Sequence, residues 1–112
     1  MAQRKIVIHR SARQLELYDG DRILGRYPIA VGKSATPTPT GNYSVATKYM
    51  NPGGVFGSRW IGLSLPHYGI HGTNNPSSIG TQASLGCIRM HNRDVEVVYN
   101  QINEGTPVII RP

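Results

Sequence analysis

Acidic side chains are scarce in this chain of 112 residues and are confined to its two ends. The sequence has six Asp and Glu residues, and none of them lies between positions 22 and 93. This gap argues against chemistry that needs paired carboxylates, such as glycoside hydrolysis, and against an oxygen-ligated calcium or magnesium site. Twelve Lys and Arg residues leave a formal net charge of +6.

Cysteine and long apolar runs are also in short supply. The single cysteine, Cys87, has no partner for an internal disulfide, so it is either a core residue or a reactive thiol. No apolar run approaches the ~20 residues of a membrane span, and residues 1–10 show no apolar signal-peptide core. We therefore expect one domain over residues 1–112, with no membrane span and no export signal in this segment.

Alternating apolar residues and frequent turn formers predict a mainly β chain. Residues 14–18 alternate with period two, and the Asp-Gly pair that follows predicts a hairpin to a strand beginning at Arg22. The Thr-Pro segment 36–41 is expected to be a loop because proline lacks a donor for a central ladder. The remaining strands are expected over residues 5–9, 22–31, 42–48, 59–65 and 107–110.

One helix is expected near the C-terminus, over about residues 92–104. Its apolar positions recur at the spacing of one helical face, at Val95, Val98, Tyr99 and Ile102. Asn92 is the expected N-cap and Gly105 the expected C-terminal stop. Asp94 and Glu96 lie in the first turn, where the helix dipole favours negative charge, so both have a structural explanation.

The residues with reactive side chains are concentrated between positions 67 and 91, which hold three of the four histidines and the only cysteine. A nearby imidazole or cation lowers the pKa of a thiol and makes it a nucleophile. His71 and Arg89 are the expected sources of these two effects on Cys87. Gly86 allows close approach of a substrate to the backbone, where neighbouring N–H groups can hold an oxyanion.

The order and spacing of these residues resemble the active-site signature of the L,D-transpeptidases, the YkuD-like catalytic domains. The signature consists of His71-Gly72-Thr73 and of Ser84-x-Gly86-Cys87-Ile88-Arg89-Met90, with Cys87 sixteen residues after His71. The likeness extends upstream to the segments 30–33, 36–41 and 51–54, and so covers nearly the whole chain. The resemblance implies a β-sandwich-like catalytic fold with one prominent helix.

The resemblance also implies a cysteine acyltransferase that cross-links bacterial peptidoglycan. Cys87 would attack the bond between the diamino acid and D-alanine of a tetrapeptide stem, form a thioester, and pass the acyl group to an amine of another stem, giving a 3→3 cross-link. His71 would be the general base, oriented by the backbone carbonyl of Gly72, although Asp94 also remains able to approach it in space. Water as the acceptor would instead make the chain an L,D-carboxypeptidase or hydrolase on the same substrate.

The other residues carried over from the family are expected to line the substrate site. These are Arg89, Ser84, Tyr68 and Trp60. Leu85 stands where many family members have histidine, so an oxyanion hole must rely on backbone N–H groups, those of Gly86 and of the cysteine. The family reading implies no cofactor and no metal, stem peptides rather than nucleic acid as partners, a monomer, and an extracytoplasmic, cell wall-associated location inferred from the substrate.

Three alternatives stay open at this stage. His67-x3-His71 and Cys87-x3-His91 together offer a tetrahedral zinc set, with His67 on the face of His71 if that stretch is a regular strand. The charge of +6 is compatible with a module that binds polyanions, although the basic residues are scattered and aromatics make up only 7%. Arg89 has a structural alternative, a surface ion pair with an acid of the following helix.

Overall fold

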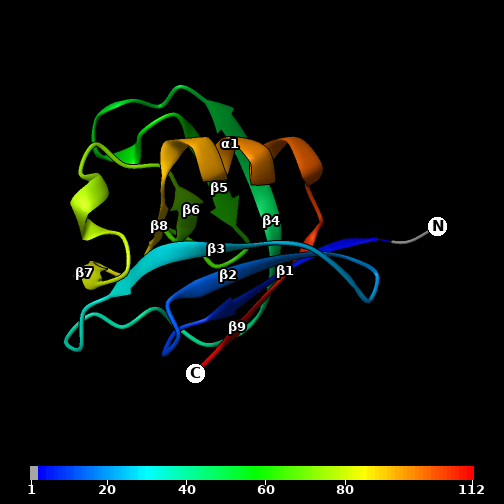
Figure 1. The fold of residues 1–112 in the computed structure, drawn as a ribbon, viewed down its shortest axis with the longest axis horizontal. Coiled ribbons are helices and arrows are strands. Elements are labelled where there is room, and N and C mark those ends of the chain that lie inside the picture. The colour runs from blue at the N-terminus through cyan, green and yellow to red at the C-terminus, as the bar shows by residue number, and fades with distance from the viewer. Residues whose placement is uncertain (1–2) are drawn as a thin grey trace.

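The computed structural model describes residues 3–112, and over this range the chain is mainly β, as expected. It contains nine strands, one α-helix and two short 3-10 helices, η1 and η2 (Figure 1). The strands are β1 Arg4–His9, β2 Gln14–Asp19, β3 Arg22–Gly32, β4 Gly41–Met50, β5 Arg59–Leu63, β6 Gly69–His71, β7 Gln82–Ser84, β8 Ile88–Met90 and β9 Pro107–Arg111. The helices are η1 Gly54–Phe56, η2 Pro76–Ser78 and α1 Asn92–Gln101. Within residues 3–112, no helix has both the length and the apolar character that crossing a bilayer requires.

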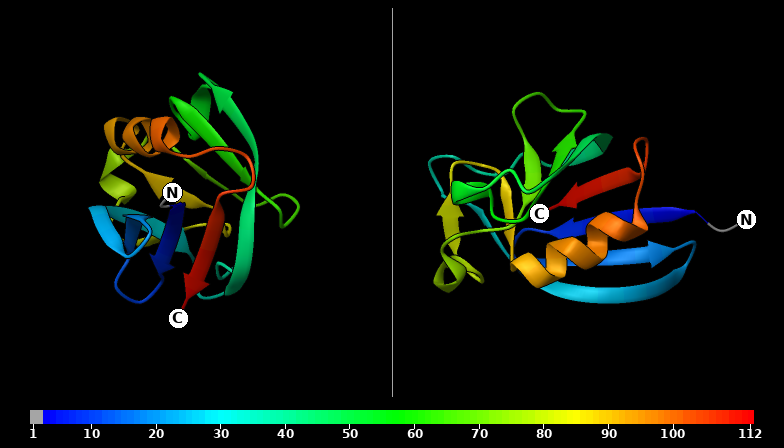
Figure 2. Two further views of the ribbon diagram at one scale, coloured as in Figure 1. Left: turned by 90° about the vertical axis from the view of Figure 1, so that its right-hand side faces the viewer. Right: turned by 90° about the horizontal axis from the view of Figure 1, so that it is seen from above.

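The strands form one continuous sheet that closes on itself. The order is β2-β1-β9-β4-β5-β6-β8-β3-β7, and an additional pairing of β2 with β3 joins the two ends of the run of eight strands. The sheet curls so that β1, β2, β3 and β9 lie on one side of the molecule, while α1 crosses the other side and packs against β5 and β6 (Figures 1 and 2). The enclosed space is the core.

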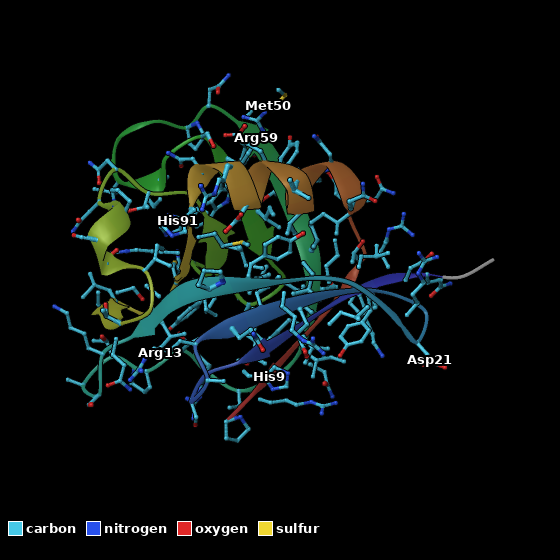
Figure 3. The ribbon with its side chains drawn as sticks, viewed as in Figure 1. His9, Arg13, Asp21, Met50, Arg59 and His91 are labelled. Carbon is cyan, nitrogen blue, oxygen red and sulfur yellow. The ribbon has the colours of Figure 1, made fainter. Side chains whose placement is uncertain are left out.

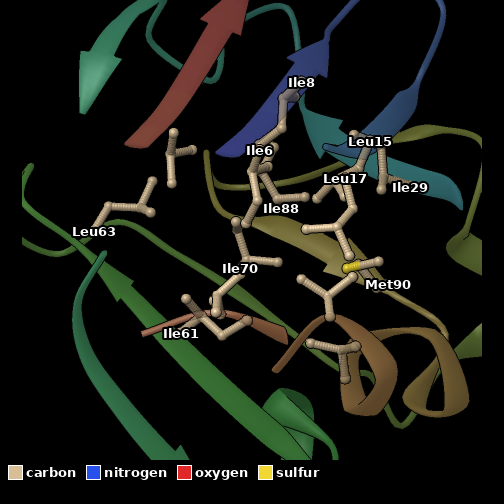
Figure 4. Close-up of a cluster of buried hydrophobic side chains, with 14 of the residues drawn as sticks. Ile6, Ile8, Leu15, Leu17, Ile29, Ile61, Leu63, Ile70, Ile88 and Met90 are labelled. Atoms are coloured by element: carbon tan, nitrogen blue, oxygen red, sulfur yellow. The ribbon is translucent and has the colours of Figure 1, made fainter. Parts of the chain in front are cut away.

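Aliphatic side chains from almost every strand fill this core (Figure 4). The largest fully buried ones include Ile6, Ile8, Leu15, Leu17, Ile29, Ile61, Ile70, Ile88 and Met90. Ile70 of β6 is paired with Ile88 of β8, and both side chains point inward, being 0% and 1% exposed. Because side chains alternate along a strand, the residues on either side of these two isoleucines point out of the core.

Most of the expected strands and loops are confirmed, with ends that differ by a few residues. The hairpin of β2 and β3 pairs Gln14 with Pro28 at its open end and Asp19 with Arg22 at its turn, and its register shifts by one residue between Leu17 and Tyr18. The segment 36–40 has no regular structure and β4 begins at Gly41. The strands β6, β7 and β8 were not predicted, since three residues are too few for a periodic pattern. β7 and β8 are held by β3, which is distant in sequence, while β6 pairs with its neighbour β5 and with β8.

The helix begins at Asn92 as expected, but Asn92 is not its N-cap. His91 occupies that position, and its carbonyl accepts the N–H groups of Asp94 and Val95, both at 3.0 Å. The Asn92 side chain makes no bond to the first turn, because its amide is engaged by two loop segments next to the candidate site.

The helix ends at Gln101, three residues before the predicted end. Ile102 is extended, with φ −124° and ψ 162°, and its side chain is buried in the core. The ammonium group of Lys48, on β4, donates to the Ile102 carbonyl at 2.7 Å and so replaces a helical partner for that group. Gly105 has φ +91° but lies in the following turn, so it is not the helix stop.

Candidate active site

Strand register places the sequence-predicted residues on one face of the sheet. Trp60 of β5 is opposite His71 of β6, and His71 is beside Arg89 of β8. These three side chains lie on the face opposite to the buried Ile61, Ile70 and Ile88. Cys87 directly precedes β8 and, two residues before Arg89, shares its side of the strand.

A pocket of about 570 Å³ lies over this face, and Cys87, His71, Arg89, Trp60, Tyr68 and Ser84 all line it. All the side chains assigned to the substrate site from the sequence therefore gather in one place. The rim of the pocket is largely apolar and includes Val55, Phe56, Pro66 and Leu85. Leu85 is 78% exposed, so the position where many family members carry histidine holds an apolar side chain at the mouth of the pocket.

The His71 ring is fixed by a backbone carbonyl. Its Nδ1 lies 2.5 Å from the carbonyl oxygen of Gly72, and because a carbonyl only accepts hydrogen bonds, Nδ1 carries the proton. The lone pair is therefore on Nε2. Burial lowers the pKa of His71 below its usual value, the Gly72 carbonyl opposes this shift, and the nearby Arg89 lowers the pKa further. The imidazole is neutral at neutral pH.

Two aromatic rings enclose this imidazole. Trp60 is stacked on His71 with ring centroids 5.6 Å apart and an interplanar angle of 15°, and Phe56 meets it edge-on at 5.1 Å and 88°. The Trp60 ring covers Gly69, where a Cβ would overlap the indole. Phe56, on η1, was missed by the sequence reasoning. Its only signal was an apolar pair, Val-Phe, flanked by the glycines of segment 53–57.

The Cys87 thiol is half-buried beside the turn that precedes β6. Its Sγ is 3.7 Å from the carbonyl oxygen of His67. Burial raises the pKa of Cys87, while a hydrogen bond from the Gly69 backbone and the charge of Arg89 lower it less strongly. Arg89 lowers the pKa of Cys87, as expected from the sequence, but burial outweighs this effect and the net shift is upward. The thiol is protonated at neutral pH.

Ser84 shapes the turn that carries Cys87. Its Oγ accepts the Gly86 N–H at 3.0 Å and donates to the Cys87 carbonyl at 2.6 Å. Gly86 has φ +130°, and a Cβ there would overlap the ring of Tyr68, which explains why glycine is needed. Since the Gly86 N–H is engaged by Ser84, the Cys87 N–H is the one left for an oxyanion of the two that the sequence suggested.

Thr38 fixes the same turn from the Thr-Pro loop. Its buried hydroxyl accepts the Gly32 N–H at 3.0 Å and donates to the Gly86 carbonyl at 2.8 Å. From the sequence, the Thr-Pro segment 36–41 is expected to be a rigid loop, and no contact with the site is predicted for it. Its contact with the turn at Gly86 spans 48 positions and has no local signal.

The histidines outside the pocket centre do not form a metal site. His67 has φ +72° and lies in the turn before β6, so it is not on a strand face with His71. His91 is the N-cap of α1 (Figure 3). Over residues 3–112, no three His, Cys, Asp or Glu side chains are grouped so that they could hold a metal ion, so the zinc set is not brought together.

Arg89 does not form the alternative ion pair with the helix. Asp94 is 3.8 Å from its neighbour Arg93, and Glu96 accepts a hydrogen bond from the Ser58 hydroxyl at 2.7 Å. Arg89 takes part in none of the salt bridges among the described residues. Its charge therefore faces the pocket that it lines, next to His71 and Cys87.

Comparisons with known proteins identify the family and the fold of this chain. A family model of the L,D-transpeptidase catalytic domain matches residues 3–110. The YkuD protein of Bacillus licheniformis is 53% identical over 108 residues, which cover 96% of this chain and 66% of that protein. Among solved structures, L,D-transpeptidase 3 from Mycobacterium tuberculosis has a TM-score of 0.89 at 19% identity, over 99% of this chain and 62% of that one. The LD transpeptidase LdtMt1 in complex with imipenem has a TM-score of 0.85 at 17% identity, over 98% of this chain and 59% of that one.

The chain thus spans between 59% and 66% of the length of these relatives. The likeness to the solved structures concerns the fold, whereas the family model and the Bacillus protein carry the sequence relationship over nearly all of the chain. By its sequence, the chain belongs to the L,D-transpeptidase catalytic domain family.

Proposed function

We propose that this chain is the catalytic part of an L,D-transpeptidase acting on peptidoglycan stem peptides, with Cys87 as the nucleophile and His71 as the general base. One observation carries the proposal. The only thiol of the chain lines the same pocket as an imidazole whose Nδ1–H is held by Gly72, which leaves the lone pair of Nε2 to accept a proton.

In the first half-reaction both reacting groups start neutral. Nε2 of His71 takes the proton of the Cys87 thiol as Sγ attacks the carbonyl carbon of the diamino acid in a tetrapeptide stem. The negative charge on the carbonyl oxygen of the tetrahedral intermediate is stabilised by the Cys87 N–H. When the intermediate collapses, the C–N bond to D-alanine breaks, its nitrogen takes the proton from Nε2, and a thioester remains.

In the second half-reaction an amine of another stem attacks the thioester carbon. Nε2 accepts the proton of this amine, the C–S bond breaks, and the proton passes to the sulfur. The products are a new amide, the 3→3 cross-link, and the restored thiol. With water as the acceptor the same steps give hydrolysis, which is the second candidate function and uses the same residues.

The remaining pocket residues suit the substrate. Arg89 provides a cation for the carboxylate of the terminal D-alanine, and Trp60 and Tyr68 provide the walls. Ser84 acts on the turn at Gly86 and is assigned a supporting role. Because the substrate lies outside the cytoplasmic membrane, we propose an extracytoplasmic, cell wall-associated location. The monomeric state stays a prediction.

Intact-mass spectrometry with imipenem tests the proposal. The wild-type chain is expected to gain the mass of one imipenem molecule, Cys87→Ala to gain none, and His71→Ala to react on the order of 10²–10⁴-fold more slowly. A correctly folded wild-type chain that gains no mass, or a Cys87→Ala variant that does, would contradict the assignment. With tetrapeptide stems, a cross-linked dimer identifies transpeptidation and loss of D-alanine alone identifies hydrolysis, while turnover confined to pentapeptide stems would refute the L,D class.

A further inference from the structure

The side-chain amide of Asn92 is bonded to the segment that follows His71. Its Oδ1 accepts the Thr73 N–H at 3.0 Å, and its Nδ2 donates to the Thr73 carbonyl at 3.1 Å. The two bonds make a closed, reciprocal pair of the kind that joins two strands. The first residue of α1 is thereby attached to the backbone just beyond the imidazole.

The Thr73 N–H and the Gly72 carbonyl belong to the same peptide group. That group is planar, so its N–H and its C=O point in opposite directions and cannot turn independently. The carbonyl accepts the Nδ1–H of His71, and the N–H donates to Asn92. A continuous line of hydrogen bonds therefore runs from His71 through one peptide group to Asn92.

Asn92 is also bonded to the segment that follows η1. Its Oδ1 accepts a second hydrogen bond, from the Ser58 N–H at 3.1 Å, two residues after Phe56, whose ring packs against His71 in a T-shaped arrangement. A Cβ on either Gly57 or Gly72 would overlap this Oδ1. Two glycines thus leave the space that the amide oxygen occupies, which indicates local packing built around this one atom.

We propose that Asn92 is a positioning residue for His71, acting through the Gly72–Thr73 peptide group. The proposal rests on the proposed function, in which His71 is the general base. By holding the N–H of this peptide, Asn92 sets the direction of its carbonyl and hence the plane of the imidazole. Each hydrogen bond in such a line also polarises the next, so the Gly72 carbonyl becomes a better acceptor for Nδ1–H.

A carboxylate often holds the corresponding place beside a catalytic histidine, where it orients the ring and stabilises its charged form. Here a neutral amide provides orientation without a full negative charge. The rings packed against His71 are the uncharged Trp60 and Phe56, and Arg89 on the neighbouring strand is the cation that acts on its pKa. The other titratable groups lining the same pocket are His67, Tyr68 and Cys87. A change in the titration of His71 in the uncharged variant Asn92→Ala would therefore be transmitted through the peptide group.

NMR of the imidazole nitrogens tests this without relying on turnover. In a Cys87→Ala background, we expect Nδ1 to be protonated when Asn92 is present, and Asn92→Ala to produce a mixture of tautomers and a lower pKa of His71. Asn92→Asp keeps an acceptor for the Thr73 N–H and adds negative charge, so it is expected to keep the tautomer and raise this pKa. Asn100→Ala, at another exposed asparagine of the same helix, is the matched control and is expected to change neither.

Acylation by imipenem gives the second readout, in chains that retain Cys87. Asn92→Ala is expected to slow acylation on the order of tenfold, as for the loss of one hydrogen bond, and Asn100→Ala to leave it unchanged. Unaltered tautomer and rate in Asn92→Ala, or equal lowering of the pKa by Ala and Asp, would overturn the proposal. If Asn92→Ala does not fold, the tautomer in Asn92→Asp decides, and a mixture of tautomers there, although the acceptor for the Thr73 N–H is kept, would overturn the proposal. Failure of the wild-type chain to react with imipenem would refute the proposed function, while the NMR shifts would still report on the positioning role.

Discussion

The protonation state of the Cys87 thiol can be measured by the rate at which it is alkylated. Burial raises the pKa of Cys87, and the Gly69 backbone and Arg89 only partly offset this. Even an unperturbed thiol is at most about 3% ionised at pH 7, and Cys87 is expected to be ionised less. A preformed thiolate–imidazolium pair would be almost fully ionised, so the two states differ about 30-fold or more in reactivity at neutral pH.

Iodoacetamide reacts with the thiolate, so its rate constant follows the ionised fraction. We expect this rate to rise continuously from neutral pH into the alkaline range, about tenfold per pH unit below the pKa, with no plateau near neutrality. A plateau that begins below about pH 7, as papain-like thiols show, would refute the reasoning. It would mean that the pocket stabilises the charged pair more than burial disfavours it.

Two variants separate ionisation of the thiol from base catalysis. Because His71 is neutral at rest, His71→Ala is expected to leave the position of the alkylation profile unchanged while it slows acylation by imipenem. Arg89→Met removes the positive charge that lowers the pKa of Cys87, so it is expected to move the profile to higher pH. If His71→Ala instead moved the profile strongly to higher pH, His71 would be charged in the resting site.

Two further predictions concern the supports of the fold. Thr38→Val removes the hydroxyl that donates to the Gly86 carbonyl and leaves the Gly32 N–H without its partner. Urea unfolding should therefore show a free energy of unfolding lower by about 1–3 kcal/mol, and acylation by imipenem should be slower. Wild-type values in both assays would count against the role of Thr38. Glu16 has a pKa below its usual value, mainly through its hydrogen bond with His9, although burial opposes the shift. Its folded-state pKa is therefore below the unfolded one, so its stabilisation is complete above the unfolded value and is lost as the pH falls through the folded value. Thermal unfolding from neutral pH into acid should accordingly show a smaller acid-induced loss in Glu16→Gln than in the wild-type chain, and an equal loss would contradict this account.

The pocket residues could be predicted from the sequence because their identity and spacing carry information locally. A thiol preceded by glycine, an arginine two residues later and a histidine sixteen residues earlier are all visible along the chain. The register of β6 and β8, which brings Cys87 and His71 to one face, was not predicted. It depends on pairing between strands of three residues, which have no periodic signal of their own.

The hydrogen bonds of Thr38 and Asn92 that hold the pocket could not be predicted, because each joins residues that are distant in sequence. Thr38 reaches its partner over 48 positions, and Asn92 reaches Thr73 and Ser58 over 19 and 34. Asn92 also looked like a helix cap, which is the commonest use of asparagine at a helix start. Local propensity predicts the helix start correctly but predicts the wrong partner for the Asn92 side chain. The amide is bonded to backbone groups of Thr73 and Ser58 and not to the first turn of the helix.

Over residues 3–112, no acidic residue lines the pocket, and this part of the gap between positions 22 and 93 suits the proposed chemistry. In the proposed reaction the resting thiol and imidazole are both neutral, and the imidazole must accept a proton at neutral pH. A buried carboxylate on Nδ1 would favour the charged imidazolium and hold a proton on the ring before the thiol could give up its own. It would also repel the carboxylate of the terminal D-alanine of the proposed substrate, for which we propose Arg89 as the cation. A backbone carbonyl backed by the neutral amide of Asn92 orients His71 while avoiding both effects, so a pocket without acids suits this chemistry better than one with them.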